Sequence, residues 1–568
     1  MKKFLQKALA VALASAMVVG MTACGDKTGT SASDSTSKTS VSASASKADD
    51  STSAASTEAG IAGWTKFDNT VDLKIPVYDR GEGSNGVKDV VNNDWTKWVQ
   101  EQFGDAWNIK VTYVPITRSD VLTTYALLAA DKNLPTICAE YDYPKMTQWI
   151  NDGYLVPYDV EWFKQIAPTY YSRMENSGVI NLTNVGGEDY LAFGTRAYGF
   201  STYTWATFYR LDWVKAAGYD KFPEKLSDQI ECYKKIKELG LCEYPLGGTR
   251  VTGAGVDQNH GYRDYPQDEV LWATTGDYNI PALGTEAQKR LLKVVNEEYN
   301  LGLIDPEFYT KEAADAQSDF VNGKSFVYSC YLSSTIAPLE SFYAENPNGE
   351  VGLMVCPGYV TDEKYNWSTA YRAGLNVGAY VGFSSMASDD EKKAAAMYLE
   401  WLAQPENLFQ FQWGIEGKNF EYKNGDPVAI STEGMGHNSN VDYWMLVEAI
   451  KSIGDINKDC AAISPQNLPV DFTADIIANY NGQLDVYNQG KANVDCYFSS
   501  AIEAEAEYAQ TLYTKYEEYR TQLTKCAPEE FDALYEELSQ KYLKDGYQAV
   551  IDGRKAAFEA GNGTHLSK

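Results

Sequence analysis

The sequence predicts a large mixed α/β protein that folds into at least two domains. Three observations support this fold class. Strand and helix patterns alternate from residue 73 onward, the chain after residue 60 is too long for one hydrophobic core, and the last stretch is amphipathic and helical. The alternation therefore indicates layered α/β structure, and the length indicates more than one core.

Short apolar runs separated by helical patterns predict the first three strands. These strands are 73–78, 109–114 and 134–139. Between them, apolar residues recur near helical spacing over 88–103, and Ser119 can cap a helix that runs to about residue 130. The strand–helix–strand order predicts crossover connections and a mainly parallel sheet. Ligands bind outside the carboxyl ends of such strands, here the loops 78–83 and 140–143.

The later elements continue the mixture. They are a strand over 206–211 that enters a helix at Asp212, a helix over 288–299 that ends at Gly302, a helix over 315–321, a strand over 325–330, a helix over 389–403 that starts after Ser388, and two or three helices over 500–561. No internal repeat is visible in the sequence.

The N-terminus has the pattern of a secretory signal peptide. Met1-Lys2-Lys3 precedes an apolar run over 8–23, which is shorter than the roughly 20 residues that span a bilayer. An uncleaved membrane anchor is the alternative. Small residues before Cys24 resemble a bacterial lipobox, in which the cysteine is acylated. We therefore expect residues 1–23 to be a signal peptide and Cys24 to carry the lipid.

A tether follows this cysteine. Residues 24–60 are rich in Ser, Thr and Ala and hold almost no large apolar side chain, so they cannot form a core. No later segment is apolar enough to cross a membrane. The formal net charge of −29 excludes binding to duplex nucleic acid, because affinity for the phosphate backbone comes from Lys and Arg.

The cysteines and histidines do not form a metal-binding pattern. Eight cysteines follow Cys24 at irregular spacing with no C-x-x-C pair, and the chain has only three histidines. We interpret most of the cysteines as small buried hydrophobic residues. Only an accident of geometry would join Cys232 and Cys242. No cofactor is expected.

Catalytic motifs are also missing from the sequence. The stretch NGKS at 322–325 lacks the earlier glycine of a P-loop, and GAGVDQ at 253–258 lacks the third glycine of a dinucleotide fingerprint. No H-E-x-x-H or G-x-S-x-G occurs. A carboxylate pair for glycoside cleavage is not excluded, because 78 acidic residues offer too many candidates.

Eight stretches in order resemble a family 1 extracellular solute-binding protein, the substrate-capturing lipoprotein of ABC-type sugar importers, in its large Gram-positive subgroup. They are LLAADKNLPTICAEYDY (127–143), DGYLVPYD (152–159), GGEDYLAFGTR (186–196), FYRLDWVKAAGY (208–219), YNLGLIDPEFY (299–309), FVNGKSFVY (320–328), WGIEGKNFEY (413–422) and EEFDALYEELSQKYLKDGYQAVIDGRKAAFE (529–559). The third departs from the family pattern, with Phe193-Gly194 where proline is usual.

The resemblance implies a periplasmic-binding-protein-like fold of two discontinuous α/β lobes with a hinge, a cleft between the lobes and extra C-terminal helices. With chain crossings near 196, 356 and 415, the lobes are expected to be 61–195 plus 357–415 and 196–356 plus 416–568. It also implies a monomeric non-enzyme, anchored by lipid on the outer face of a Gram-positive cell membrane. Its partners would be an oligosaccharide and ABC permease subunits.

Sugar recognition needs aromatic planes for the ring faces and polar forks for the hydroxyls. The chain has 41 Tyr and 13 Trp, and most of these rings serve structure, so position must narrow the candidates. The expected strand ends give Tyr78, Asp79, Arg80, Glu140 and Tyr141. Loops, crossings and the family stretches add Trp205, Trp272, Tyr331, Arg372, Asn376, Trp413 and Glu416.

No metal site is predicted, although one segment is spaced like a calcium loop. Asp455, Asn457 and Asp459 have that spacing, but Cys460 and Gln466 replace the required Gly and Glu. Two alternatives to a transport protein stay open. The secretory route and the many carboxylates also suit a surface-anchored polysaccharide-degrading enzyme, and a glycan adhesin would need no closing lobes.

Overall fold

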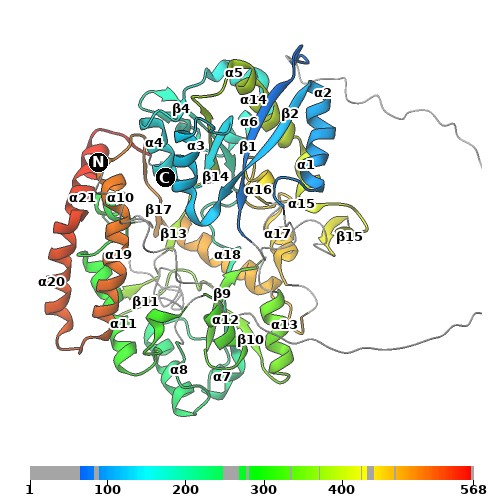
Figure 1. Cartoon of the computed structure of the whole chain (residues 1–568). Helices are drawn as coiled ribbons and strands as arrows, with labels where there is room; N and C mark the ends of the chain where they lie inside the picture. The colour runs from blue at the N-terminus through cyan, green and yellow to red at the C-terminus, as the bar shows by residue number, and fades with distance from the viewer. Residues whose placement is uncertain are drawn as a thin grey trace, which may run out of the picture. The chain divides into compact units, whose positions relative to one another are not determined.

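The computed structural model describes residues 64–81, 89–246, 268–276, 280–311, 313–332, 336–369, 371–423, 425–430, 441–465 and 468–564. Residues 60–568 form one compact unit, shown in Figure 1. The expected signal peptide, Cys24 and the tether lie outside the described residues.

The first two strands form the predicted parallel pair. β1 (Val71–Asp79) lies beside β2 (Ile109–Thr117), with Tyr78 opposite Ile116 and Asp79 opposite Thr117. The connection is less regular than the sequence pattern predicts. Asn93 caps α1 (Asp94–Val99), which continues as a π-helix (Gln100–Gly104) and then as α2 (Asp105–Trp107). Trp95, Val99 and Phe103 are buried on this run, which accounts for the apolar spacing in the sequence.

The expectation of a mainly parallel sheet is wrong. β14 (Val377–Ser384) pairs antiparallel with three strands, β3 (Ile137–Glu140), β4 (Leu155–Val156) and β7 (Leu191–Thr195). The backbone N–H of Thr136 still joins the start of β3 to Lys74 on β1 at 2.9 Å. The reason for the error is that β14 comes from a distant segment and enters between strands that run the opposite way.

A large hydrophobic core surrounds these strands. It contains buried residues from Val71 to Phe193 and from Leu375 to Val447. The elements around it are α3 (Val121–Ala130), α4 (Tyr143–Asn151), α5 (Val160–Ile166), α6 (Pro168–Asn176), α14 (Asp389–Ala403), α15 (Pro405–Trp413), α16 (Val441–Trp444), β5 (Asn184–Val185) and β6 (Glu188–Asp189). The cap of α3 is Asp120, not the predicted Ser119, because Arg118–Asp120 forms a 3-10 turn first. Ser388 caps α14 as predicted.

A second sheet is antiparallel throughout. β8 (Trp205–Arg210) lies between β9 (Val327–Tyr331) and β10 (Val351–Leu353) and contributes to two adjoining hydrophobic clusters. The elements around it are α7 (Leu211–Ala216), α8 (Leu226–Glu238), α11 (Glu286–Asn300), α12 (Ala313–Val321), α13 (Ile336–Glu345), α17 (Ile456–Ile463), α18 (Thr473–Asn488), β11 (Thr361–Asp362) and β12 (Trp367–Ser368). The strand 206–211, its following helix and the turn at Gly323 (φ +69°) are confirmed within a residue or two.

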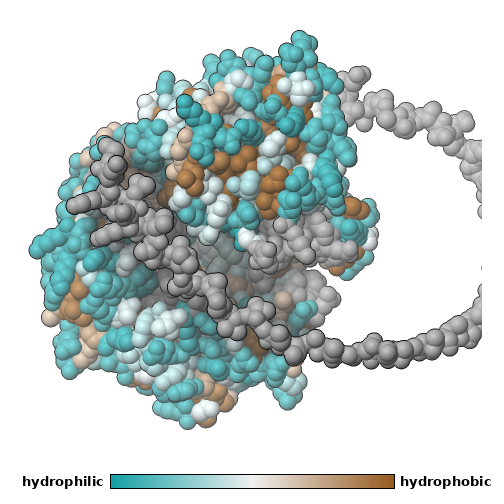
Figure 2. Space-filling model, viewed as in Figure 1, coloured by the Kyte–Doolittle hydropathy of each residue, from teal (hydrophilic) through white to brown (hydrophobic). Residues whose placement is uncertain are grey.

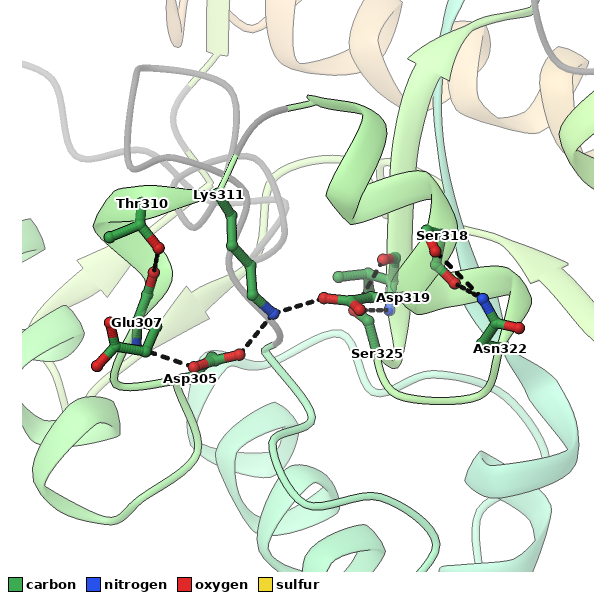
Figure 3. Close-up of polar contacts among 9 residues, drawn as sticks. Asp305, Glu307, Thr310, Lys311, Ser318, Asp319, Asn322 and Ser325 are labelled. Atoms are coloured by element: carbon green, nitrogen blue, oxygen red, sulfur yellow. Dashed lines mark hydrogen bonds and ion pairs between the residues drawn. The ribbon is translucent and has the colours of Figure 1, made fainter. Parts of the chain in front are cut away.

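One polar network fastens the loop after α11 to α12. Lys311 lies between Asp305 and Asp319, and its Nζ is 2.5 Å from a carboxylate oxygen of each (Figure 3). The three side chains are only 12–20 % exposed. The backbone O of Asp319 also accepts from the N–H of Lys324 and of Ser325, so the network extends to the turn before β9.

The last helices form a layer against α10 (Glu269–Thr275) and α11, as Figure 1 shows. This layer consists of α19 (Glu503–Lys525), α20 (Phe531–Tyr542), a π-turn at Leu543–Tyr547 and α21 (Gln548–Glu559). Its core contains Ile280, Leu283 and Leu292 with the inner faces of α19 and α20. Short strand pairs complete the chain: β13 (Tyr371–Ala373) with β17 (Ala492–Val494), β15 (Phe420–Lys423) with β16 (Asp426–Ala429), and β18 (Tyr497–Phe498) with β19 (Gly563–Thr564).

The face seen in Figure 2 is mostly hydrophilic. Among the described residues, no helix combines the length and the apolar character needed to cross a membrane. None of the eight described cysteines is in a disulfide, four of them are buried, and burial raises the pKa of Cys232 and of Cys460 to about 12. These two thiols therefore behave as small core residues.

Candidate functional site

The carboxyl ends of the first three strands bring four side chains together. Tyr78 is the next-to-last residue of β1, Arg118 follows β2, Glu140 ends β3 and Tyr141 comes directly after it. The Tyr78 and Tyr141 rings stack with centroids 6.3 Å apart, and the Arg118 guanidinium lies 4.8 Å from the Tyr78 ring centroid. This arrangement follows from the parallel register, because neighbouring strands end at the same edge.

Glu140 is the buried acceptor of this cluster. Its Oε2 accepts from the Tyr78 hydroxyl at 3.2 Å and its Oε1 from the Tyr141 backbone N–H at 2.7 Å. Burial and the neighbouring Glu140 charge raise the pKa of Tyr78, so its hydroxyl keeps its proton and keeps donating. Glu140 is only 2 % exposed, and the charge of this carboxylate is therefore poorly screened by water.

The other two predicted residues at the end of β1 do different work. Arg80 forms a two-pronged ion pair with Asp442 of α16, at 2.9 and 2.8 Å. The Asp442 side chain is fully buried; burial raises its pKa, and the Arg80 hydrogen bond opposes that shift. Arg80 thus fastens the strand end to α16. Asp79 is exposed and accepts from the backbone N–H of Gly81 at 2.9 Å.

A cavity of about 270 Å³ adjoins the cluster. Its lining comes from the strand ends, from α4 and from the C-terminal layer. The lining residues that matter below are Arg118, Glu140, Tyr141, Asp142, Tyr143, Lys145, Arg372, Glu505 and Arg554. Of the residues predicted from sequence, the cavity therefore brings together Glu140, Tyr141 and Arg372.

The α4 side of the cavity offers one unused polar group. Asp142 caps α4, accepting from the backbone N–H of Lys145 at 3.2 Å, and pairs with the Lys145 ammonium at 3.3 Å. Next to it, Tyr143 is 1 % exposed, and its hydroxyl has no hydrogen-bond partner among the described residues. A buried hydroxyl without a partner costs free energy, so a ligand hydroxyl would gain by bonding to it.

The opposite side of the cavity is made of ion pairs. Arg372 Nε is 2.5 Å from Asp495 Oδ1, and Arg554 Nε is 2.5 Å from Glu505 Oε1. Trp272 lies under this side: the Arg372 guanidinium is 5.3 Å from its ring centroid, and its Nε1 donates to the backbone O of Val494 at 2.6 Å. Trp272 is 7 % exposed, so its buried ring packs against the Arg372 guanidinium and fixes the position of that side chain.

Trp205 and Tyr331 form a separate aromatic pair on the second sheet. They face each other across the β8–β9 ladder with ring centroids 4.6 Å apart at 82°. Tyr331 is 55 % exposed, and the buried Nε1 of Trp205 has no hydrogen-bond partner in the described part of the chain. Neither residue lines the 270 Å³ cavity.

The remaining predicted residues also lie away from the cavity. Asn376 donates from Nδ2 to Ser177 O at 3.2 Å and accepts at Oδ1 from Gly199 N–H at 2.9 Å, so its amide joins the segments around Ser177 and Gly199. Trp413 is 3 % exposed, with the Lys451 ammonium 3.9 Å from its ring centroid. Glu416 is exposed on the turn before β15.

The segment spaced like a calcium loop is a helix start. Asp455 caps α17 and accepts from the backbone N–H groups of Asn457 and Lys458. Asp459 accepts from Ser452 Oγ at 2.6 Å and from Ile453 N–H at 2.7 Å. Across the described residues, no group of three or more His, Cys, Asp or Glu side chains is placed to hold a metal ion.

Sequence reasoning missed Arg118, Tyr143 and the ion pairs of the C-terminal layer. Arg118 could have been found by the rule that found Tyr78, because it follows the next parallel strand. Tyr143 had a weaker signal, because it is the last residue of the predicted loop 140–143 and the structure makes it the first residue of α4. Glu505 and Arg554 had none, because only the tertiary fold brings them to the cavity.

Comparisons with known proteins agree with this architecture. A family model described as bacterial extracellular solute-binding protein matches residues 91–408. No curated protein sequence matches the chain. Among solved structures, the alginate-binding protein AlgQ2 is similar with a TM-score of 0.57 and 16 % identity, covering 87 % of this chain and 99 % of that chain.

Two Streptococcus pneumoniae proteins are similar to the same extent. The ABC-transporter substrate-binding protein FusA in complex with kestose has a TM-score of 0.54 and 13 % identity, covering 86 % of this chain and 100 % of that chain. The N-glycan transport solute-binding protein NgtS has a TM-score of 0.54 and 14 % identity, covering 86 % and 99 %. At such identities the likeness establishes the fold, which is periplasmic-binding-protein-like, as predicted.

Proposed function

Because the chain belongs to the bacterial extracellular solute-binding protein family, we propose that it captures an extracellular oligosaccharide between two α/β lobes and delivers it to the membrane subunits of an ABC transporter. The observation that carries the proposal is the strand-end cluster beside the cavity. Tyr78, Tyr141, Glu140 and Arg118 combine aromatic rings with a fixed acceptor and a fixed donor. Sugar rings and hydroxyls require this combination.

Two further observations support a sugar as the ligand. Tyr331 presents an exposed ring held edge-on by Trp205, a surface that suits the C–H face of a sugar. Similar structures are described as an alginate-binding protein, a substrate-binding protein in complex with kestose and an N-glycan transport solute-binding protein, and they share this fold. Together these favour a glycan over a peptide or an ion.

The same proposal includes lobe closure. We take the lobes as 61–195 plus 357–415 and 196–356 plus 416–568, with crossings near 196, 356 and 415. Asn376 supports a crossing there, since its amide bonds to Gly199 and its backbone O accepts from Arg196 N–H at 3.2 Å. Segment 441–447 belongs to the second lobe by these bounds, but it packs into the first core. The boundary at 415 is therefore the one that expressing each lobe separately would test best.

We also propose that Cys24 is acylated after cleavage of residues 1–23 and holds a monomer on the outer face of a Gram-positive cell membrane. Two acyl chains give stable attachment, because each buried methylene contributes about 0.8 kcal/mol. The sequence around Cys24 and the extracellular family support this. Metabolic labelling with an alkynyl palmitate should mark the wild type and leave Cys24→Ser unmarked.

Isothermal titration against a panel of neutral and acidic oligosaccharides tests the binding proposal. We expect one-to-one binding of about micromolar affinity. Tyr141 lines the cavity, and Tyr141→Ala should weaken binding about 10-fold or more, since a buried aromatic contact contributes roughly 1.5–3 kcal/mol. Tyr422→Ala is the matched control, because Tyr422 is 50 % exposed on β15 and does not line the cavity. A panel without any glycan binder, alongside peptides that bind, would contradict the proposal.

Product analysis separates this function from the alternatives. A polysaccharide-degrading enzyme would convert the bound oligosaccharide to shorter products, whereas a transport protein returns it unchanged. An adhesin would bind polymer without a change in radius of gyration. We expect intact ligand and a smaller radius of gyration in solution scattering, because lobe closure brings the two sheets together.

A further inference from the structure

We propose that the cavity selects an uncharged sugar unit and rejects an acidic one, with Arg118 and Glu140 as the residues that set this preference. The inference rests on the proposed function and names the substrate class of the same site. It starts from the charges around the cavity. The lining contains four cationic side chains and three carboxylates, and each must be assigned a partner before the site's net charge is known.

Three of the four cations are already neutralised at short range. Lys145 pairs with Asp142 at 3.3 Å, Arg554 with Glu505 at 2.5 Å, and Arg372 with Asp495 at 2.5 Å. The Arg372–Asp495 side chains are 11 % and 7 % exposed, and those of Arg554 and Glu505 are 3 % and 15 % exposed. Arg80, which could have made the region cationic, is neutralised by Asp442.

Arg118 and Glu140 remain, and one tyrosine joins them. The Arg118 guanidinium lies over the Tyr78 ring, and the hydroxyl of that ring donates to Glu140. No described carboxylate lies within 4.0 Å of Arg118, and no described cation lies within 4.0 Å of Glu140. Their opposite charges therefore balance across Tyr78, and the charges of the described residues around the cavity sum to zero once Asp495 is counted with Arg372.

A neutral sugar fits this balance. One hydroxyl can accept from Arg118 while another donates to Glu140, and the buried Tyr143 hydroxyl supplies a third polar contact. A carboxylate on the same unit would bond well to Arg118 but would add an uncompensated charge near Glu140, which is 2 % exposed. Like charges at low screening disfavour binding, which is how a site rejects a near-isosteric ligand.

The charge of the whole chain acts in the same direction. A formal net charge of −29 lowers the local concentration of anionic glycans around the protein, whereas neutral glycans are unaffected. This long-range contribution weakens with salt, because exposed charges are screened over about 10 Å at 0.1 M ionic strength. The Glu140 contribution should persist in salt, because this carboxylate is buried.

Matched ligands test the inference. Each acidic probe is paired with the neutral oligosaccharide that has CH₂OH in place of its carboxylate: α-1,4-galactotriose with trigalacturonate, mannotriose with trimannuronate, and cellotriose with its uronate analogue. Titration calorimetry at 0.15 M and 0.5 M NaCl gives both affinities. We expect a neutral member to bind at least 10-fold more tightly than its acidic partner at both salt concentrations.

Two substitutions then test the residues. Glu140→Gln keeps the shape and removes the charge, so the ratio of acidic to neutral affinity should rise at least 10-fold. Arg118→Gln should lower affinity for both ligands and make the ratio more unfavourable to the acid. Arg118 is half-buried at the strand end, so Arg118→Gln should disturb folding less than a change at the buried Glu140. The Arg118 variant therefore tests the inference even if Glu140→Gln does not fold. Glu188→Gln, an exposed carboxylate outside the cavity, is the control.

The outcomes distinguish the two proposals. Tighter binding of an acidic probe by the wild type would overturn the inference and leave oligosaccharide capture intact. An unchanged acidic-to-neutral ratio in both variants would overturn the role of Arg118 and Glu140. The absence of any glycan binding would overturn the proposed function, and this inference with it.

Discussion

At the scale of single residues, Lys451 shows how burial changes the chemistry of a side chain. Its ammonium donates to the Gln412 backbone O at 2.9 Å and lies against the Trp413 ring. Burial lowers the pKa of Lys451 from 10.5 to about 8. Between pH 8 and 10.5 the unfolded chain therefore holds a proton that the folded chain has released, and the free energy of unfolding should rise with pH in that window.

Lys451→Met should remove this pH dependence. Urea denaturation at pH 7.5 and 9.5 should show the wild type gaining about 2 kcal/mol relative to the variant, since one pKa unit corresponds to about 1.4 kcal/mol. Lys418→Met, which removes an exposed lysine, should keep the wild-type slope. A Lys451→Met protein with the same slope as the wild type would show that another group causes it.

The site residues separate by whether their contacts are local. Glu140 and Tyr141 could be predicted because strand ends face the cavity wherever parallel strands share an edge. Asn376 and Trp413 could not be assigned from sequence, because their partners Ser177, Gly199 and Lys451 come from distant segments. A sequence shows which residue types suit a ligand. It does not show which of those side chains already bond to other residues of the folded chain.

At the scale of elements, α14 tests the capping rule. Ser388 Oγ accepts from the Glu391 backbone N–H at 3.3 Å, and the Glu391 carboxylate accepts from the Ser388 backbone N–H at 2.7 Å. Ser388→Ala should lower the free energy of unfolding by about 1 kcal/mol, whereas Ser388→Asn should preserve most of it, since Asn caps equally well. Thermal melting of both variants measures the difference; equal losses in the two would exclude the cap as the cause.

The Lys311 network tests whether ion pairs link elements in the second sheet region. Lys311→Met would leave Asp305 and Asp319 facing each other without a cation. We expect a loss of about 1–3 kcal/mol in urea denaturation, because the carboxylates are mostly but not fully buried. Adding Asp319→Asn should recover part of the loss by removing the repulsion, and Lys324→Met, which removes a neighbouring lysine after α12, is the control. A double variant no more stable than the single one would contradict this account.

Elements with strong local signals were predicted well, and pairing partners were not. α14 and the strand 206–211 have a cap or a sharp composition change at their ends. The π-helix at Gln100–Gly104 was missed because the Gln100 side chain, bonding to Asp105 and to the backbone O of Ile109, sets the local winding. The antiparallel partner of β3 was missed because β14 follows more than 200 residues later in the chain.

At the scale of the whole molecule, the C-terminal layer joins fold to site. Glu505 and Arg554 line the cavity, and Arg554 also donates to the Thr274 backbone O of α10 at 3.1 Å. The layer therefore completes one wall of the site as well as covering α11. This is the part of the site that sequence reasoning could not predict, because its residues are remote from every strand end.

Truncation measures how much the body depends on this layer. A chain that ends at residue 502 would expose Ile280, Leu283 and Leu292, each now about 1 % exposed. At roughly 1.5–3 kcal/mol for each side chain, the lost burial approaches the 5–15 kcal/mol that stabilises a typical domain. We expect no cooperative thermal transition and no glycan binding from this chain, and wild-type behaviour from one that lacks only residues 565–568. If the truncated protein melts cooperatively but binds no glycan, the layer is needed for the binding site and not for folding. If it also binds glycan normally, the layer is needed for neither.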